Sequence, residues 1–234
     1  MTREAQGGLM LAVGIIVTRL AIAGGHTSYV RPWLGILLVI GGVFIGVLGI
    51  LTVWSSLRHQ DDQHEHGAPA VGWLVLVPML VLVTIAPAPL GAYAAGVKAG
   101  ARAVPKANFP PVAEATDGAV TMQVREFVGR AVYDPGSLRD VRVRLTGLVA
   151  PDESAPSGYL LTRFVVGCCA ADATPVQIAV AGDGASRSTD SWVEVTGVWR
   201  PQPAAPNDPF LESIPVLDAD GTRTVPAPES QYEY

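Results

Sequence analysis

The stretch WLGILLVIGGVFIGVLGILT, residues 33–52, decides how the N-terminal part of this chain is built. It is twenty residues long and contains no charged side chain. An α-helix rises about 1.5 Å per residue, so a stretch of this length can cross a hydrocarbon core of about 30 Å. Trp33 and Trp54 stand at its two ends, where tryptophan prefers the lipid headgroup region. We therefore expect a transmembrane helix over about residues 33–54.

Two further apolar stretches predict two more transmembrane helices, over about residues 7–25 and 70–88. The first contains Arg19, which lies near one end and can extend its charge toward the interface. A cleaved signal peptide is the alternative for this first stretch, because Ala21-Ile22-Ala23 resembles a cleavage site. The n-region has only Arg3, offset by an adjacent glutamate, and this favours a retained span. Residues 1–96 are thus predicted to be the three-helix region of a multi-pass membrane protein in the lipid bilayer.

Charge separates this region from the rest of the chain. The 234 residues contain 16 Lys and Arg and 21 Asp and Glu, for a net charge of -5. Residues 1–96 hold only four basic and four acidic residues, so most of the charge lies in residues 97–234. A net negative chain has no general attraction for phosphate, so we expect no nucleic-acid partner. Residues 97–234 contain no histidine, the usual general base, and no catalytic motif, so we expect no enzymatic activity.

The C-terminal half has the pattern of a small β-rich domain. Residues 97–117 are rich in proline and small residues and predict a linker, which places the domain at 118–234. Apolar residues at helical spacing from Val120 to Val132 predict one leading amphipathic helix. Strands are predicted at 141–149, 159–166, 176–180, 192–199 and 214–217. Five short strands, with the first and fourth closing on Gly147 and Gly197, favour an OB-like β-barrel, that is, a barrel of the oligonucleotide/oligosaccharide-binding type.

The two cysteines of the chain are adjacent, at Cys168 and Cys169, and Asp172 follows three residues later. Neighbouring residues on a strand point to opposite faces, so a shared site requires a turn, which Gly167 permits. Three interpretations stay open: buried packing groups, a vicinal disulfide, or soft ligands for zinc or copper(I) with Asp172 as a third donor. No other cofactor is implied.

A second candidate metal site lies between the predicted second and third spans. His59, His64 and His66 occur within eight residues and alternate with carboxylates. Such a segment can hold a divalent metal, although a solvated polar loop explains the same composition.

Helix contacts are predicted inside the membrane region. Gly42 and Gly46 form a GxxxG step, which lets another helix approach closely. Arg19 is a further candidate for contact with a partner helix.

Two segments of the C-terminal half, residues 160–173 with the run Cys-Cys-Ala-Ala-Asp and residues 192–197, resemble the YcgQ-like family of bacterial permease subunits. So do Tyr29-Val30-Arg31-Pro32, the histidine-containing loop and residues 87–91. The resemblance covers nearly the whole chain and implies a bacterial cell membrane location. It also implies a polytopic permease subunit, encoded nearby, as the partner. Many relatives have a longer loop with more histidines, so the resemblance does not strengthen metal binding by residues 59–66.

These observations predict a non-enzymatic accessory subunit of a permease complex, whose soluble domain handles metal or thiol-reactive cargo. The alternative is a membrane-tethered metal or thiol-redox sensor without a transport role. A polytopic permease that copurifies with the chain would favour the first function. A ligand-dependent change in the isolated domain would favour the second.

Overall fold

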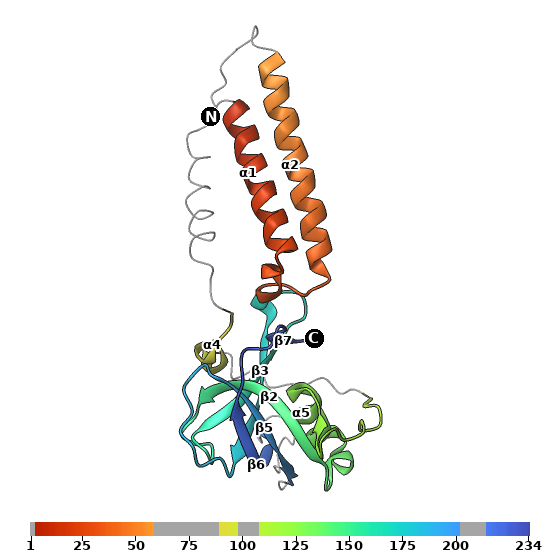
Figure 1. Cartoon of the computed structure of the whole chain (residues 1–234), viewed down its shortest axis with the longest axis vertical. Helices are drawn as coiled ribbons and strands as arrows, with labels where there is room; N and C mark the ends of the chain where they lie inside the picture. The colour runs from red at the N-terminus through yellow and green to blue at the C-terminus, as the bar shows by residue number, and fades with distance from the viewer. Residues whose placement is uncertain (1–2, 59–88, 98–107, 202–213) are drawn as a thin grey trace. The chain divides into compact units, whose positions relative to one another are not determined.

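The computed structural model describes residues 3–58, 89–97, 108–201 and 214–234. The chain divides into two compact units, Met1–Ala88 and Pro89–Tyr234 (Figure 1). The predicted third span at 70–88 lies outside the described residues, as do His59, His64 and His66.

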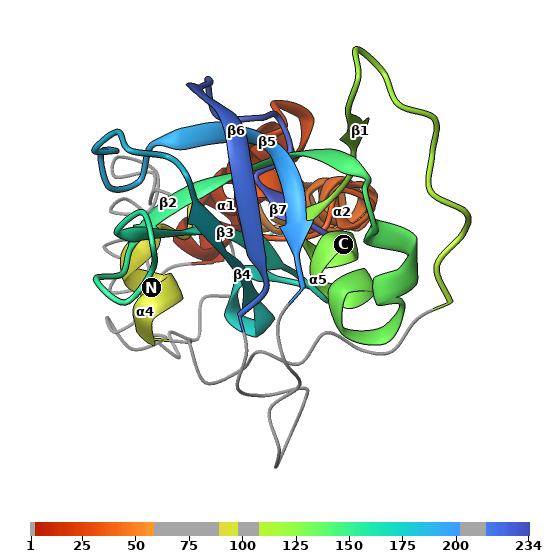
Figure 2. The ribbon, with the colours of Figure 1, turned by 90° about the horizontal axis from the view of Figure 1, so that it is seen from below.

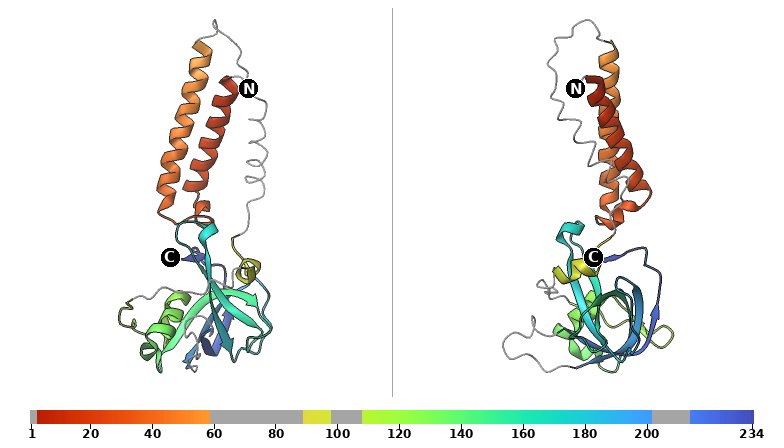
Figure 3. Two further views of the ribbon diagram at one scale, coloured as in Figure 1. Left: turned by 180° about the vertical axis from the view of Figure 1, so that it is seen from behind. Right: turned by 90° about the vertical axis from the view of Figure 1, so that its left-hand side faces the viewer.

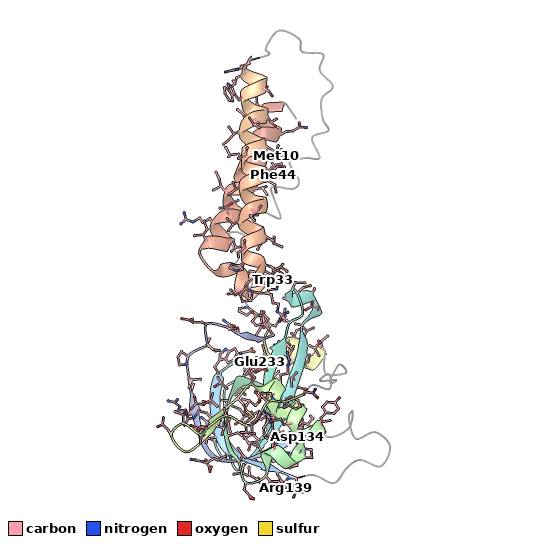
Figure 4. The ribbon with its side chains drawn as sticks, turned by 90° about the vertical axis from the view of Figure 1, so that its right-hand side faces the viewer. Met10, Trp33, Phe44, Asp134, Arg139 and Glu233 are labelled. Atoms are coloured by element: carbon pink, nitrogen blue, oxygen red, sulfur yellow. The ribbon has the colours of Figure 1, made fainter. Side chains whose placement is uncertain are left out.

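The first unit is a helical hairpin. Helix α1 covers Arg3–Ile22, the short 3-10 helix η1 covers Gly25–Ser28, and helix α2 covers Leu34–Arg58. Within the described residues, α1 from Glu4 onward and α2 are long and apolar enough to cross a bilayer. A buried helix or a signal sequence also meets that criterion of length and composition. The large apolar side chains of α2 are exposed in the hairpin, however, including Ile36 and Ile40. Phe44, labelled in Figure 4, is exposed on the same helix. A soluble core helix would bury them.

Glycines allow the two helices of the hairpin to pack closely. A Cβ atom added at Gly14 of α1 would lie 2.6 Å from the carbonyl oxygen of Gly42 in α2. A Cβ added at Gly42 would collide with Thr18 of α1, whereas one at Gly46 would meet no atom within 4 Å. Small residues that bring helix backbones together are typical of transmembrane packing. Gly42, predicted to contact a partner helix, therefore contacts α1 of its own chain.

The second unit contains one seven-stranded sheet. Its strands are β1 (Val120–Thr121), β2 (Arg142–Pro151), β3 (Tyr159–Val165), β4 (Thr174–Ala181), β5 (Trp192–Arg200), β6 (Val216–Thr224) and β7 (Tyr232–Glu233). The order is β1-β2-β5-β6-β4-β3-β7, with an additional pairing of β2 with β3. Three pairs are parallel, namely β1 with β2, β4 with β6 and β3 with β7. The two-residue strands β1 and β7 are the ends of this order and give the sheet edges, so the unit is not a simple closed barrel. The additional β2–β3 pairing links the strands between those ends, which are β2, β5, β6, β4 and β3, into a ring.

The main core lies between the sheet and helix α5, which covers Val124–Tyr133 (Figures 2 and 3). Phe127 of α5 is fully buried, as are Leu145 of β2 and Val195 of β5. Alternate residues of β2 and β5 enter this core, as expected for strands with one buried face. A 3-10 helix, η3 (Pro135–Leu138), follows α5 and buries Leu138 in the same core.

A smaller cluster packs helix α4 (Ala92–Val97) onto the sheet. Ala92 and Ala95 of α4 are buried with Phe164 of β3 and Tyr232 of β7. The backbone N–H of Ala92 also donates to the Asp190 carboxylate over 2.6 Å. Residues 89–97 therefore pack within the second unit, whereas the sequence pattern predicts a membrane region that extends to residue 96.

Three sequence predictions about this unit are wrong in detail. Val120 belongs to β1 and pairs with Val143, so the leading helix begins only at Val124. Gly147 and Gly197 lie inside β2 and β5 and do not end them. A Cβ at Gly147 would lie 2.7 Å from Leu161, and one at Gly197 would collide with the backbone of β6, where the β5–β6 register shifts. These glycines let neighbouring strands approach each other closely.

Candidate metal centre

Cys168, Cys169 and Asp172 lie together in the turn between β3 and β4. One possible ligand atom from each residue lies within 4.8 Å of the others. Cys168 and Asp172 are exposed and Cys169 is half-buried. The structure thus brings together the three residues predicted from the sequence. Exposure of Cys168 argues against the interpretation that both thiols serve as packing groups.

The carboxylate of Asp172 gives this turn its shape. Its Oδ1 accepts the backbone N–H of Gly167 over 2.9 Å, and its Oδ2 accepts those of Cys168 over 2.7 Å and Cys169 over 3.4 Å. The backbone N–H of Asp172 donates in return to the carbonyl of Cys169 over 3.0 Å. These bonds, together with the Cys169 side chain, cap the short 3-10 helix η4 (Ala170–Asp172). The turn that the two cysteines need in order to face one ligand is therefore held by Asp172.

The same carboxylate controls the charge of the Cys168 thiol. A hydrogen bond to Asp172, and then one with Cys169, raises the pKa of the Cys168 thiol to about 11. The hydrogen bond from the Cys168 side chain, followed by that from its backbone, lowers the pKa of Asp172. At neutral pH the carboxylate is ionised and Cys168 keeps its proton. A thiol in that state is a poor nucleophile, and a metal ion must displace its proton to bind.

The strand that leads into the turn is held by the C-terminal tail. Val166 donates its backbone N–H to the carbonyl of Glu233 over 3.0 Å, which continues the β3–β7 pairing. The Glu233 carboxylate accepts the first backbone N–H groups of α5, from Val124 over 2.9 Å and Arg125 over 2.8 Å. It also lies 3.5 Å from Nε of Arg163 on β3. Glu233 is labelled within this unit in Figure 4. The sequence pattern does not predict this contact, because Glu233 lies in a short polar tail without strand periodicity.

Comparison with known proteins identifies part of this unit. Residues 125–234 match the DUF1980 C-terminal domain. The match supports an uncharacterised bacterial family. No curated protein and no solved structure shows significant similarity to the chain.

The DUF1980 match contains the whole candidate site. Cys168, Cys169 and Asp172 fall inside it, and so does Glu233. Helices α1, α2 and α4 lie before its first residue. The domain name describes no activity, so the chemistry of the site rests on the geometry above.

The remaining predicted site residues belong to the hairpin. Arg19 is exposed and borders an apolar groove between α1 and α2. Gly46 lines the same groove, and its missing side chain leaves open space there. The structure therefore places Arg19, Gly42 and Gly46 along one groove, and Gly42 also lies in close contact with α1.

Proposed function

We propose that this protein is a YcgQ-like, multi-pass membrane subunit of a bacterial permease complex and binds a soft metal ion in its DUF1980 domain. It carries out no catalysis in this role. The observation that carries the proposal is the pair of adjacent thiols, exposed at Cys168 and half-buried at Cys169, held in a turn by Asp172. Two apolar helices in the same chain support attachment to the bilayer.

The metal chemistry follows from the ligand types. Thiolates are soft donors that favour zinc and copper(I) over magnesium or calcium. Closed structural zinc sites use four protein ligands, whereas this turn offers fewer. The open coordination positions suit a site from which an ion passes to a partner subunit. We propose a polytopic permease as that partner.

The fold of the DUF1980 domain agrees with a carrier or docking role. Strand β2 pairs with both β3 and β5, and β4 pairs in parallel with β6. We propose that these five strands form an OB-like, partly open arrangement, with β1 and β7 added at its edges. OB-like domains have many unrelated functions, so this likeness supports a binding role in general and no particular ligand.

The thiol-redox sensor is less well supported than metal binding. Redox-sensing cysteines are exposed thiols with a lowered pKa, because the thiolate is the reactive species. Cys168 is exposed, but its neighbour Asp172 raises the thiol pKa to about 11. A protonated thiol reacts slowly with oxidants, whereas a strongly bound cation can still displace the proton.

The proposal is tested by metal transport in cells. A strain of the source organism without this gene would receive the wild-type gene, a gene with Cys168→Ser and Cys169→Ser, or a gene with Asp152→Asn. Asp152 is a matched control, because it accepts the backbone N–H of Ser154 in another exposed turn of the same domain. We expect uptake or export of zinc or copper to depend on the gene and on the two cysteines but not on Asp152.

Two results contradict the proposal. One is metal transport that does not change when the gene is deleted. The other is full activity of the double cysteine variant at equal membrane abundance, measured by immunoblot. The second result would leave a membrane role for the chain and remove the metal site from it.

A further inference from the structure

We infer that Cys168 and Cys169 are the only side chains of this site that bind the metal, and that such a two-thiolate site selects copper(I) over zinc. Asp172 is then a positioning residue, not a ligand. The inference rests on the proposed function and specifies the ion that the site accepts.

The hydrogen bonds of Asp172 are the first reason. Both of its carboxylate oxygens already accept backbone N–H groups, one from Gly167 and two from the cysteines. These groups are in the turn that presents the thiols, so turning the carboxylate toward a metal would release the turn. Space is also tight, because a Cβ added at Gly167 would lie only 3.0 Å from Asp172 Oδ2. We therefore expect the Asp172 carboxylate to keep its hydrogen bonds to the turn when a metal ion binds to the two thiols.

The number of donors is the second reason. Across residues 3–58, 89–97, 108–201 and 214–234, the cluster contains two cysteines and one aspartate and no histidine. With Asp172 committed to the backbone, zinc would have two protein ligands, half of its usual tetrahedral set. Copper(I) is a softer ion, and two thiolate sulfurs satisfy it. The same pair of ligands therefore favours copper(I).

The binding step balances without any change of oxidation state. The two S–H bonds break, two copper–sulfur bonds form, and both protons pass to solvent. Copper enters as copper(I) and remains copper(I). Because two protons are released, the affinity for copper(I) should increase with pH.

The test uses the full chain, purified in detergent under reducing, oxygen-free conditions. Copper(I) is titrated in competition with a chromophoric copper(I) chelator, and zinc in competition with a zinc chelator. We expect one copper(I) per chain, bound at least about 100-fold more tightly than zinc. X-ray absorption at the copper edge should show two sulfur neighbours and no oxygen neighbour from Asp172.

Three variants separate positioning from ligation. Cys168→Ser and Cys169→Ser should each abolish tight copper(I) binding. Asp172→Asn keeps one oxygen acceptor, so it should weaken binding about tenfold while the copper retains its two sulfur neighbours. The control Asp152→Asn should bind as the wild-type chain does. Circular dichroism reports whether each variant is folded.

The outcomes distinguish this inference from the proposed function. Tighter binding of zinc, or an oxygen neighbour that disappears in Asp172→Asn, would overturn the inference and leave a metal-binding function. If neither ion binds the wild-type chain, the proposed function itself fails. The sulfur count in the wild-type chain decides the question of ligation even if Asp172→Asn does not fold.

Discussion

Replacement of Glu233 should destabilise the C-terminal unit more than any surface change in the same tail. This carboxylate is almost fully buried, at 3% exposure, and it accepts two backbone N–H groups at the start of α5. Its charge also faces the Arg163 guanidinium, which is 8% exposed. In Glu233→Ala the two donors lose their acceptor, and the buried cation loses its counterion.

The magnitude follows from these contacts. Removal of one member of a buried ion pair costs about 3–5 kcal/mol, because the other charge stays buried without compensation. Glu233→Gln removes the charge but keeps one oxygen that can accept an N–H, so we expect a loss of about 1–3 kcal/mol. Burial raises the pKa of Glu233, partly offset by its hydrogen bonds and by Arg163. The ionised carboxylate is therefore itself costly, which places the loss in Glu233→Ala at the lower end of its range.

The assay is denaturant unfolding of the full chain in detergent, followed by the strand signal in circular dichroism. Glu229→Ala is the matched control, since Glu229 is an exposed glutamate four residues earlier in the tail. The control should change the free energy of unfolding by less than about 0.5 kcal/mol. A Glu233→Ala chain that unfolds at the same denaturant concentration as Glu229→Ala would refute the assignment of β7 as the element that holds β3 and α5 together.

Three further measurements test other parts of the structure. Hydrogen bonds from Arg187 lower the pKa of Asp183 below its unfolded value near 4. The ionised carboxylate therefore stabilises the folded chain above about pH 4, and this stabilisation is lost as the pH falls through the folded pKa. Acid titrations followed by circular dichroism should show a smaller pH dependence for Asp183→Asn, and an unchanged curve would contradict the assignment. Because Asp172 raises the pKa of Cys168, alkylation of this thiol by iodoacetamide at pH 7.5 should be roughly tenfold or more slower than that of a free cysteine. It should be faster in Asp172→Asn, and equal rates measured by mass spectrometry would argue against the hydrogen bond. In the hairpin, Gly42→Ala should lower the free energy of unfolding in detergent by about 1–3 kcal/mol, because its Cβ collides with α1. Gly46→Ala should be nearly neutral, because its Cβ meets open space. Similar melting of the two variants would contradict the close approach of the helices.

Sequence alone determined the elements whose signals are local. Twenty uncharged residues in succession are sufficient to predict α2, because helix length and hydrocarbon thickness are fixed quantities. Alternation of apolar and polar residues likewise located β2, β3, β4 and β5 to within about two residues. The adjacent thiols of the candidate site were also evident, because they are the only cysteines in the chain.

Only the tertiary structure decided which elements contact one another and which contacts the small and polar residues make. Glu233 caps a helix that begins 109 positions earlier, and no local pattern encodes a contact across that separation. Val120 has helical spacing in the sequence, but in the structure it belongs to the edge strand β1. Its backbone there pairs with β2, whose N–H and C=O groups need hydrogen-bond partners. Gly147 resembles the end of a strand until Leu161 is seen to pass within 2.7 Å of its missing side chain. Asp172, finally, was predicted as a ligand from its residue type, but its role depends on which donors surround it. The three backbone N–H groups that bind its carboxylate come together only when the chain turns after β3.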